Sequence, residues 1–288
     1  NMAVAPTMSS YFEPWLQFKQ PLVRQLAFCI ASPNILQQIP NELEIRCPFH
    51  FHPSELWQKH FEAYLPRLKQ LEQHPSALVE FLQKLKSTRL GLRFEMFMWF
   101  WLLDHPYHPY QLLGHSIQKI DGPRTVGELD FVLKNTESGE VEHWEVALKY
   151  YLAERDFQLP YWYGLNRSDT LARKLNHFTQ KQFQFDEALG QQIQQRYCVL
   201  KGQLYLPIQR TSTLPNWVNP ARKIGQWGHV IPSTSQGYYR LQRHEWICVQ
   251  QQPTSTTAHW WTDGLYKKDS DESYYMYRQP RLILPQTI

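Results

Sequence analysis

The segment Gly127-Glu128-Leu129-Asp130-Phe131, read together with Glu145 and Lys149, decides the fold of this chain of 288 residues. It lies in residues 125–133, where polar and apolar residues alternate as they do along a strand with one face in a core. Residues 141–152 alternate in the same way. The polar segment between them, residues 135–139, ends in glycine and predicts a hairpin turn.

The charged side chains of this predicted hairpin are expected to gather on one surface. Glu128 and Asp130 share a face of the first strand, and Glu145 and Lys149 share a face of the second with His143. A divalent metal ion would account for such a set, because Mg²⁺ binds carboxylate oxygens together with water and phosphate oxygens. A solvent-exposed strand surface with cross-strand ion pairs explains the same pattern. The alternation alone leaves both interpretations open.

Glu95 lies inside the most apolar helix that the sequence predicts, residues 91–103. Because a buried carboxylate without partners is costly, Glu95 needs a nearby charge or polar group. One candidate is the same metal ion or a water bound to it. The other is a salt bridge to Arg93 or another base.

A basic segment follows the strands. Gly164-Leu165-Asn166-Arg167-Ser168-Asp169 precedes a predicted helix over residues 170–183, with Ser168 or Asp169 as its N-cap. A helix N-terminus attracts phosphate, so Arg167, Arg173 and Lys174 are expected along a nucleic-acid backbone. For Arg173, ordinary capping and a solvated basic face are the preferred explanation. Three histidines, His105, His108 and His115, are too loosely spaced for a metal site and are expected on the surface or in loops.

The order of predicted elements divides the chain into three parts. Residues 1–88 read as a helical N-terminal region packed on the core. The core, residues 89–207, contains a helix, three strands (110–120, 125–133 and 141–152), a second helix (170–183) and a fourth strand (197–205). Residues 208–288, rich in Trp, Pro, Gly and Ser, predict an irregular β-rich C-terminal appendage.

The composition limits the classes of function that the chain can have. The formal net charge of +4 is compatible with a polyanionic partner without establishing one. The four cysteines form no C-x-x-C pair, which argues against zinc clusters and favours reduced thiols in a cytoplasmic protein. No signal peptide is visible, and the most apolar run, residues 94–103, is too short to span a bilayer, so no membrane partner is expected. Gly-rich phosphate loops, G-x-S-x-G elbows and Cys/His nucleophile pairs are absent from the sequence.

With these residues in place, the chain resembles a bacterial domain-of-unknown-function family, number 1853, over most of its length. Four blocks carry the resemblance: residues 93–95, 124–131, 143–152 and 164–171. That family looks like a branch of the PD-(D/E)XK nuclease superfamily. The resemblance implies an α/β, restriction-endonuclease-like fold with an α-β-β-β-α-β core, which is similar to the order of elements above.

The same resemblance implies roles for individual residues. Asp130 would be the main metal ligand and Glu145 the second. Glu142 and Glu128 are the substitutes if the spacing of Glu145 and Lys149 displaces a ligand. Lys149 would assist the catalytic base, and Glu95 would be the carboxylate of the helix. The implied activity is phosphodiester hydrolysis in nucleic acid, in DNA rather than RNA, with Mg²⁺ or Mn²⁺ as cofactor.

One feature departs from the superfamily motif acid-x-Lys. Ala147 occupies the acid position, and Glu145 lies four residues before Lys149. Four residues of strand span ~13 Å, against ~6.6 Å for two. Two functions are therefore expected from the sequence: a metal-dependent nuclease, or a catalytically weak or inactive nuclease-fold module that binds nucleic acid or a protein partner.

Overall fold

The computed structural model describes residues 11–209, 212–232, 237–269 and 273–280. The N-terminal part is helical, and its elements are η1 (Pro14–Gln17), α1 (Pro21–Ala31), α2 (Ser54–Gln73), α3 (Ser76–Gln83) and α4 (Leu90–Leu103). The central part comprises β1 (Tyr110–Asp121), β2 (Arg124–Asn135), β3 (Val141–Ala153), η2 (Leu159–Tyr161), β4 (Trp162–Tyr163), α5 (Leu171–His177), η3 (Phe178–Gln182), β5 (Glu187–Ala188), β6 (Gln191–Gln192) and β7 (Gln195–Pro207). The C-terminal part comprises β8 (Gly225–Gly228), β9 (Tyr238–Arg240), η4 (Arg243–Trp246), β10 (Gly264–Lys268) and β11 (Tyr274–Tyr277).

The larger elements of the central part follow the order that the sequence predicts. Helix α4 is followed by the three antiparallel strands β1, β2 and β3, then by α5, and then by β7. The predicted turn closes the β2–β3 hairpin: the N–H of Gly139, at φ +76°, donates to the carbonyl of Asn135 (2.7 Å). The predicted helix 170–183 is shorter, because a π-helical turn, η3, replaces its last residues.

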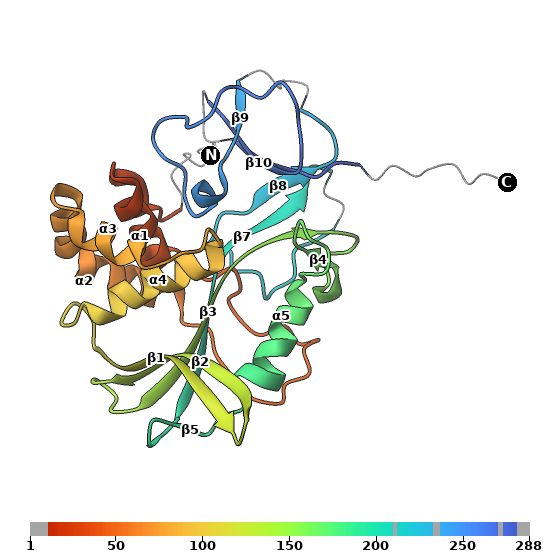
Figure 1. The fold of residues 1–288 in the computed structure, drawn as a ribbon. Coiled ribbons are helices and arrows are strands. Elements are labelled where there is room, and N and C mark those ends of the chain that lie inside the picture. Colours follow the sequence, from red (N-terminus) through yellow and green to blue (C-terminus); the bar gives the residue numbers. More distant parts are fainter. Residues whose placement is uncertain (1–10, 210–211, 233–236, 270–272, 281–288) are drawn as a thin grey trace, which may run out of the picture.

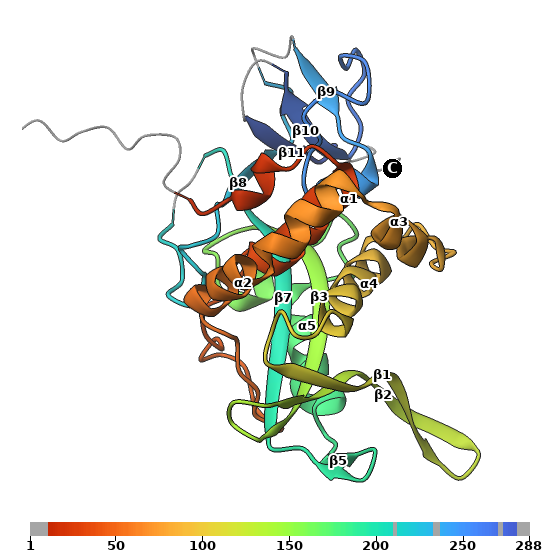
Figure 2. The ribbon, with the colours of Figure 1, turned by 90° about the vertical axis from the view of Figure 1, so that its left-hand side faces the viewer.

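A large mixed sheet runs through the molecule. The strand order is β1-β2-β3-β7-β8-β11-β10-β9, and β4 pairs with the end of β3. Neighbouring strands from β3 through β7 and β8 to β11 are parallel, and the remaining pairs are antiparallel. Figure 1 shows α1 to α4 on one side of the central strands and α5 on the other. Outside its pairing with β3, the β1–β2 hairpin extends away from the body (Figure 2).

The two faces of β3 carry the side chains that period-2 alternation predicts. Trp144, Leu148 and Leu152 pack into the main core, together with side chains of α1 to α4. Ala147 and Tyr151 face the opposite way and pack into the cluster around α5. Helix α4 is buried along most of its length, as its apolar sequence predicts. The central strands are therefore covered on both faces, which explains their nearly continuous burial.

A buried lysine joins the N-terminal helices to the sheet. Lys201 of β7 has no exposed surface, and its Nζ donates to the carbonyls of Cys29 (2.5 Å) and Ile30 (3.0 Å) at the C-terminal end of α1. The same Nζ lies 3.5 Å from the ring centre of Trp57 in α2. Burial lowers the pKa of Lys201 well below its ordinary value. These contacts satisfy orphan carbonyls of the helix and fix α1 and α2 against β7.

The C-terminal residues extend this sheet rather than forming an isolated layer. Strand β8 pairs with β7, and β11 pairs with β8 (Figure 2). Trp227 of β8 is buried and donates through Nε1 to the carbonyl of Ala153 at the end of β3 (2.9 Å). Trp260, by contrast, is 88% exposed. The aromatic tail therefore contributes core as well as surface.

All four cysteines are free, as expected. None of the helices among the described residues is long and apolar enough to cross a membrane.

Gly202 holds β7 close to β3. Its φ is +128°, and a Cβ there would lie 1.9 Å from the carbonyl oxygen of Lys149. We expect Gly202→Ala to lower the free energy of unfolding by on the order of 3 kcal/mol, from strain and overpacking together. Gly139→Ala is the control, since its φ is +76° but nothing lies within 4 Å of the added Cβ, and its cost is about 1 kcal/mol. Urea denaturation measures both, and equal losses would contradict the close approach.

Candidate functional site

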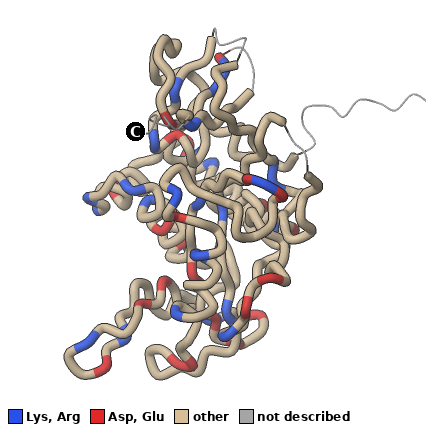
Figure 3. The backbone as a smooth tube through the Cα atoms, turned by 90° about the vertical axis from the view of Figure 1, so that its right-hand side faces the viewer, with Lys and Arg blue, Asp and Glu red and all other residues tan. Residues whose placement is uncertain are grey.

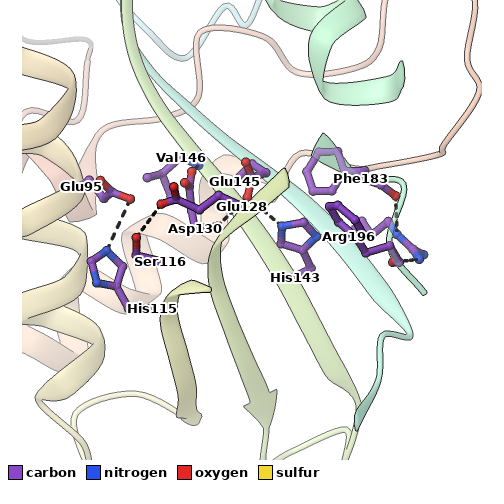
Figure 4. Close-up of polar contacts among 11 residues, drawn as sticks. Glu95, His115, Ser116, Glu128, Asp130, His143, Glu145, Val146, Phe183 and Arg196 are labelled. Carbon is purple, nitrogen blue, oxygen red and sulfur yellow. Dashed lines mark hydrogen bonds and ion pairs between the residues drawn. The ribbon is translucent and has the colours of Figure 1, made fainter. Parts of the chain in front are cut away.

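Asp130 and Glu145 face each other at the point where β2 leaves β3. Regular pairing of the two strands ends at Phe131 and Trp144. The N–H of Asp130 donates to Glu145 Oε2 (2.8 Å), and the N–H of Val146 donates to Asp130 Oδ2 (3.0 Å). Each carboxylate therefore replaces a carbonyl that the ladder would have supplied (Figure 4).

This divergence opens a cleft along the edge of β3. No β2 residue pairs with β3 beyond Trp144, and β4 pairs only with Leu152 and Ala153. The cleft has a volume of about 640 Å³ and is lined by residues 145–150, by the first turns of α4 and by α5. Five of the predicted site residues line it: Glu95, Asp130, Glu145, Lys149 and Lys174. Strand parity and the two helices thus bring most of the predicted set together.

Glu145 is the most deeply buried of these groups, with no exposed surface. Its Oε2 is shared between the N–H of Asp130 and His143 Nε2, which lies 2.7 Å away (Figure 4). Its Oε1 is buried without a hydrogen-bond partner among the described residues. Burial, assisted by the negative charges of Glu95 and Glu128, raises the pKa of Glu145 to about 8. An acid so placed keeps its proton at neutral pH unless a cation takes the proton's place.

Ionisation of the Asp130 carboxyl group is disfavoured in the same way. Burial, followed by the charges of Glu145 and Glu95, raises the pKa of Asp130 well above its ordinary value. Glu95 comes from α4 and lies 3.4 Å from His115 Nε2. Its ion pair is therefore with His115, because Arg93 instead donates to Gln25 Oε1 (2.9 Å). Three carboxyl groups from a helix and two strands thus act electrostatically on one another.

Lys149 is tied to the loop that leads into α5. Its Nζ donates to Asp169 Oδ2 (2.9 Å), and the hydroxyl of Tyr151 donates to Asp169 Oδ1 (3.2 Å). Since its carboxylate is engaged in this way, Asp169 is not the N-cap. Thr170 caps α5 instead, with its Oγ1 accepting from the N–H of Arg173 (3.2 Å). The expectation of Ser168 or Asp169 as the cap was wrong, and the link of Asp169 to Lys149 had no signal in the local sequence.

The three predicted nucleic-acid contacts are separated in the structure. Lys174 lines the cleft, where its positive charge lowers the pKa of both Glu145 and Asp130. Arg173 is exposed and donates through Nη1 to the carbonyl of Ser168 (2.7 Å), which agrees with the capping interpretation. Arg167 lies outside the cleft, paired with Glu154 and stacked 4.0 Å from the ring centre of Tyr163.

Glu128 is not brought into the cleft. Its carboxylate accepts from Ser116 Oγ (2.5 Å) and Gln118 Nε2 (2.9 Å), both on β1. His108 lies in a loop, as expected, although it is buried, whereas the expectation was wrong for His115, which is a half-buried residue of β1. The Nε2 of His108 lies 2.9 Å from the carbonyl of Trp101, and its Nδ1 accepts from the N–H of Tyr110 (3.1 Å), so both ring nitrogens are occupied.

Two parts of the chain outside the predicted motifs complete the cleft wall. Arg89 precedes α4, and Arg243 and Trp246 come from η4 in the C-terminal region. The guanidinium of Arg243 lies 4.0 Å from the ring centre of Trp246, whose carbonyl accepts from the hydroxyl of Tyr150 (2.6 Å). Figure 3 shows Lys and Arg positions interspersed with Asp and Glu positions along the chain on the side that faces the viewer.

The donor set of the cleft suits a hard divalent cation. Across the described part of the chain, no three His, Cys, Asp or Glu side chains are already arranged as a metal site. Mg²⁺ does not require three, because it is held by one or two carboxylates plus waters and substrate phosphates. Asp130 and Glu145 supply these oxygens, and the unpartnered Oε1 of Glu145 is an available ligand atom.

The comparison with protein families covers nearly the whole chain. The family described as Domain of unknown function (DUF1853) matches residues 24–283. The chain belongs to this family. No curated protein and no solved structure matched the chain. The family therefore includes the cleft, both of its walls and the C-terminal strands.

The raised pKa of Glu145 predicts a pH-dependent cost of folding. Above the unfolded value of 4.5 the unfolded chain loses this proton, whereas the folded chain keeps it up to about pH 8. Stability from this group therefore falls as the pH rises through that window. Without metal, Glu145→Gln should become more stable relative to wild type as the pH increases, and the difference should level off above about 8. Urea denaturation in the presence of a chelator measures it.

Buried His143, which contacts Glu145, acts in the opposite direction and only below pH 6.5, so the contribution of Glu145 is read between about pH 6.5 and 8. Burial lowers the pKa of His143 to about 3, so the folded protein keeps this residue neutral and loses stability as the pH falls below 6.5. A difference between variant and wild type that does not depend on pH would contradict the protonated state of Glu145.

Proposed function

We propose that this protein is a metal-dependent phosphodiesterase that acts on nucleic acid, built on the core of the PD-(D/E)XK superfamily. The order α4, β1, β2, β3, α5, β7 supports this assignment, since it corresponds to the α-β-β-β-α-β core of restriction-endonuclease-like folds. The cleft lies beside the second and third strands of this unit, where acid and lysine side chains gather.

One observation carries the proposal: two carboxylic acids are held together at the floor of a cleft. Asp130 and Glu145 each have a raised pKa, and each binds backbone N–H groups beside the other. Folding alone gives no reason to place two acids in such a position, because each makes the other harder to ionise. A divalent cation relieves both the repulsion and the burial of charge.

The residues of the cleft divide the work of hydrolysis between them. Asp130 and Glu145 would hold the ion, and Glu95 would orient water through its carboxylate. A bound Mg²⁺ or Mn²⁺ polarises the phosphodiester and lowers the pKa of water. Lys149 places an ammonium group beside the same site, where it stabilises the negative charge that develops on the phosphate. Lys174 adds a second positive charge at the opposite wall.

The hydrogen bonds that already occupy Lys149 and Glu145 favour a second function. Lys149 is held by Asp169, and Glu145 Oε2 is shared with His143. If these contacts persist when substrate is bound, the lysine does not reach the reacting phosphate. The protein would then be a nuclease-fold module that binds nucleic acid without cleaving it.

A cleavage assay separates the two functions. Wild-type protein with Mg²⁺ or Mn²⁺ should cut labelled DNA or RNA, and Asp130→Asn should reduce the rate at least ~100-fold because a metal ligand is lost. Glu137→Gln is the control, because it also replaces a carboxyl group by an amide but at an exposed position in the β2–β3 turn. Its rate should equal that of wild type.

The outcomes are distinct. Binding of nucleic acid without cleavage by wild type supports the second function. Metal-dependent cleavage that survives in Asp130→Asn rules out the proposed site.

Metal binding should release protons. At pH 7 Glu145 is protonated, since its pKa is about 8, and the ion must displace that proton. We expect Mn²⁺ affinity to increase between about pH 6 and 8 and to become independent of pH above that range. Calorimetry in buffers of different ionisation enthalpy counts the protons. In Glu145→Gln, the release assigned to this residue should disappear, and an unchanged proton count would contradict the assignment.

A further inference from the structure

A second cavity lies next to the metal cleft. It has a volume of about 520 Å³, and its lining includes Glu154, Arg167, His229 and Arg278. Leu165 lines both this cavity and the first cleft. The loop from Gly164 to Asp169 thus forms a divide between the two cavities, with Leu165 bordering both. Asp169 binds Lys149 on the side of the first cleft, and Arg167 lines the second cavity.

Two guanidinium groups are oriented in this cavity by aromatic rings. The guanidinium of Arg167 lies 4.0 Å from the ring centre of Tyr163, and that of Arg278 lies 4.5 Å from the ring centre of Trp227. Both pair with one carboxylate, that of Glu154; the Arg278 contact measures 3.5 Å. Asp263 lines the same cavity, so the two acids and the two guanidiniums balance in formal charge. Stacked guanidiniums with fixed planes are well suited to bind phosphate oxygens.

The size of the metal cleft restricts what can reach it. Glu145 has no exposed surface, so a reacting phosphate must enter the cleft to come near its carboxylate. A space of about 640 Å³ is in the range of ~300–1,000 Å³ that holds one small organic ligand, or about two nucleotides of a flexible strand. A duplex, whose wider groove alone measures about 12 Å, fills far more than this volume and meets the cleft only with its surface. An unpaired strand is flexible enough to bend into such a space.

We propose that single-stranded nucleic acid crosses Leu165 from the metal cleft into the second cavity, where Arg167 and Arg278 bind the phosphates of the nucleotides that flank the reacting bond. This inference rests on the proposed function, because it assigns the strand to the same cleft. It names the substrate class as an unpaired strand or an unpaired end, and it gives Arg167 and Arg278 a role in positioning that strand.

The test is the dependence of affinity on strand length. Fluorescence anisotropy with Ca²⁺ in place of Mg²⁺, to suppress turnover, compares a dinucleotide with an oligothymidylate of about ten nucleotides, a length that spans both cavities. Wild type should bind the longer strand at least about tenfold more tightly. Arg167→Gln and Arg278→Gln should each remove most of that gain, lower the slope of log affinity against log salt by about one, and leave dinucleotide affinity unchanged.

Two further variants keep the test decisive. Arg155→Gln is the matched control, since Arg155 also stacks on a tyrosine, Tyr161 at 4.8 Å, but lines neither cavity, and its affinities should equal those of wild type. Leu165→Glu puts a negative charge on the divide, which borders both cavities, and should weaken the longer strand more than the dinucleotide. Oligouridylate of equal length, measured in parallel, shows whether RNA is bound as well as DNA.

The inference and the proposed function fail in different ways. A blunt duplex that competes as well as the single strand, or an affinity that does not depend on length, overturns the inference and leaves Asp130-dependent cleavage untouched. A gain with length that Arg278→Gln abolishes, in a protein that cleaves nothing, supports the path of the strand and overturns the nuclease.

Discussion

The exchange of hydrogen bonds between Asp130 and Glu145 is the constraint around which the site is organised. It ends the β2–β3 ladder, because side-chain oxygens take the N–H groups that carbonyls would otherwise have accepted. The same exchange buries two acids at the opening that it creates. The hydrogen bonds of these two acids therefore both end the pairing of β2 with β3 and place the acids at the resulting opening.

The surrounding fold keeps this unfavourable arrangement in place. Lys201 anchors α1 and α2 to β7, and the close approach at Gly202 holds β7 against β3. Helix α4 packs into the main core with Trp144 of β3 and thereby carries Glu95 to the same carboxylates. Large buried apolar contacts of this kind offset the cost of two protonated acids and an unpartnered oxygen. Functional sites are commonly the places where a fold tolerates such local conflict.

Much of this arrangement follows from local patterns in the sequence. A continuous apolar run locates α4, the period of 2 locates the three strands, and strand parity places Glu145 and Lys149 on one face. The partners of these residues do not follow from any period. The carboxylate of Asp169 reaches Lys149 across a loop, and Arg243 and Trp246 reach the cleft from about a hundred residues downstream of β3. Such contacts depend on how the chain closes on itself, which neither propensity nor spacing encodes.

The C-terminal elements that line the site are the last of its parts to be synthesised. During synthesis from the N-terminus, the paired acids of β2 and β3 form part of the chain well before η4 supplies Arg243 and Trp246 to the wall of the cleft. The lining of the neighbouring cavity is completed later still, because Arg278 follows the last described strand, β11. A nascent chain therefore carries its acids without the surfaces that would hold a strand over them. The cleft and the neighbouring cavity therefore have all of their walls only once synthesis has passed β11.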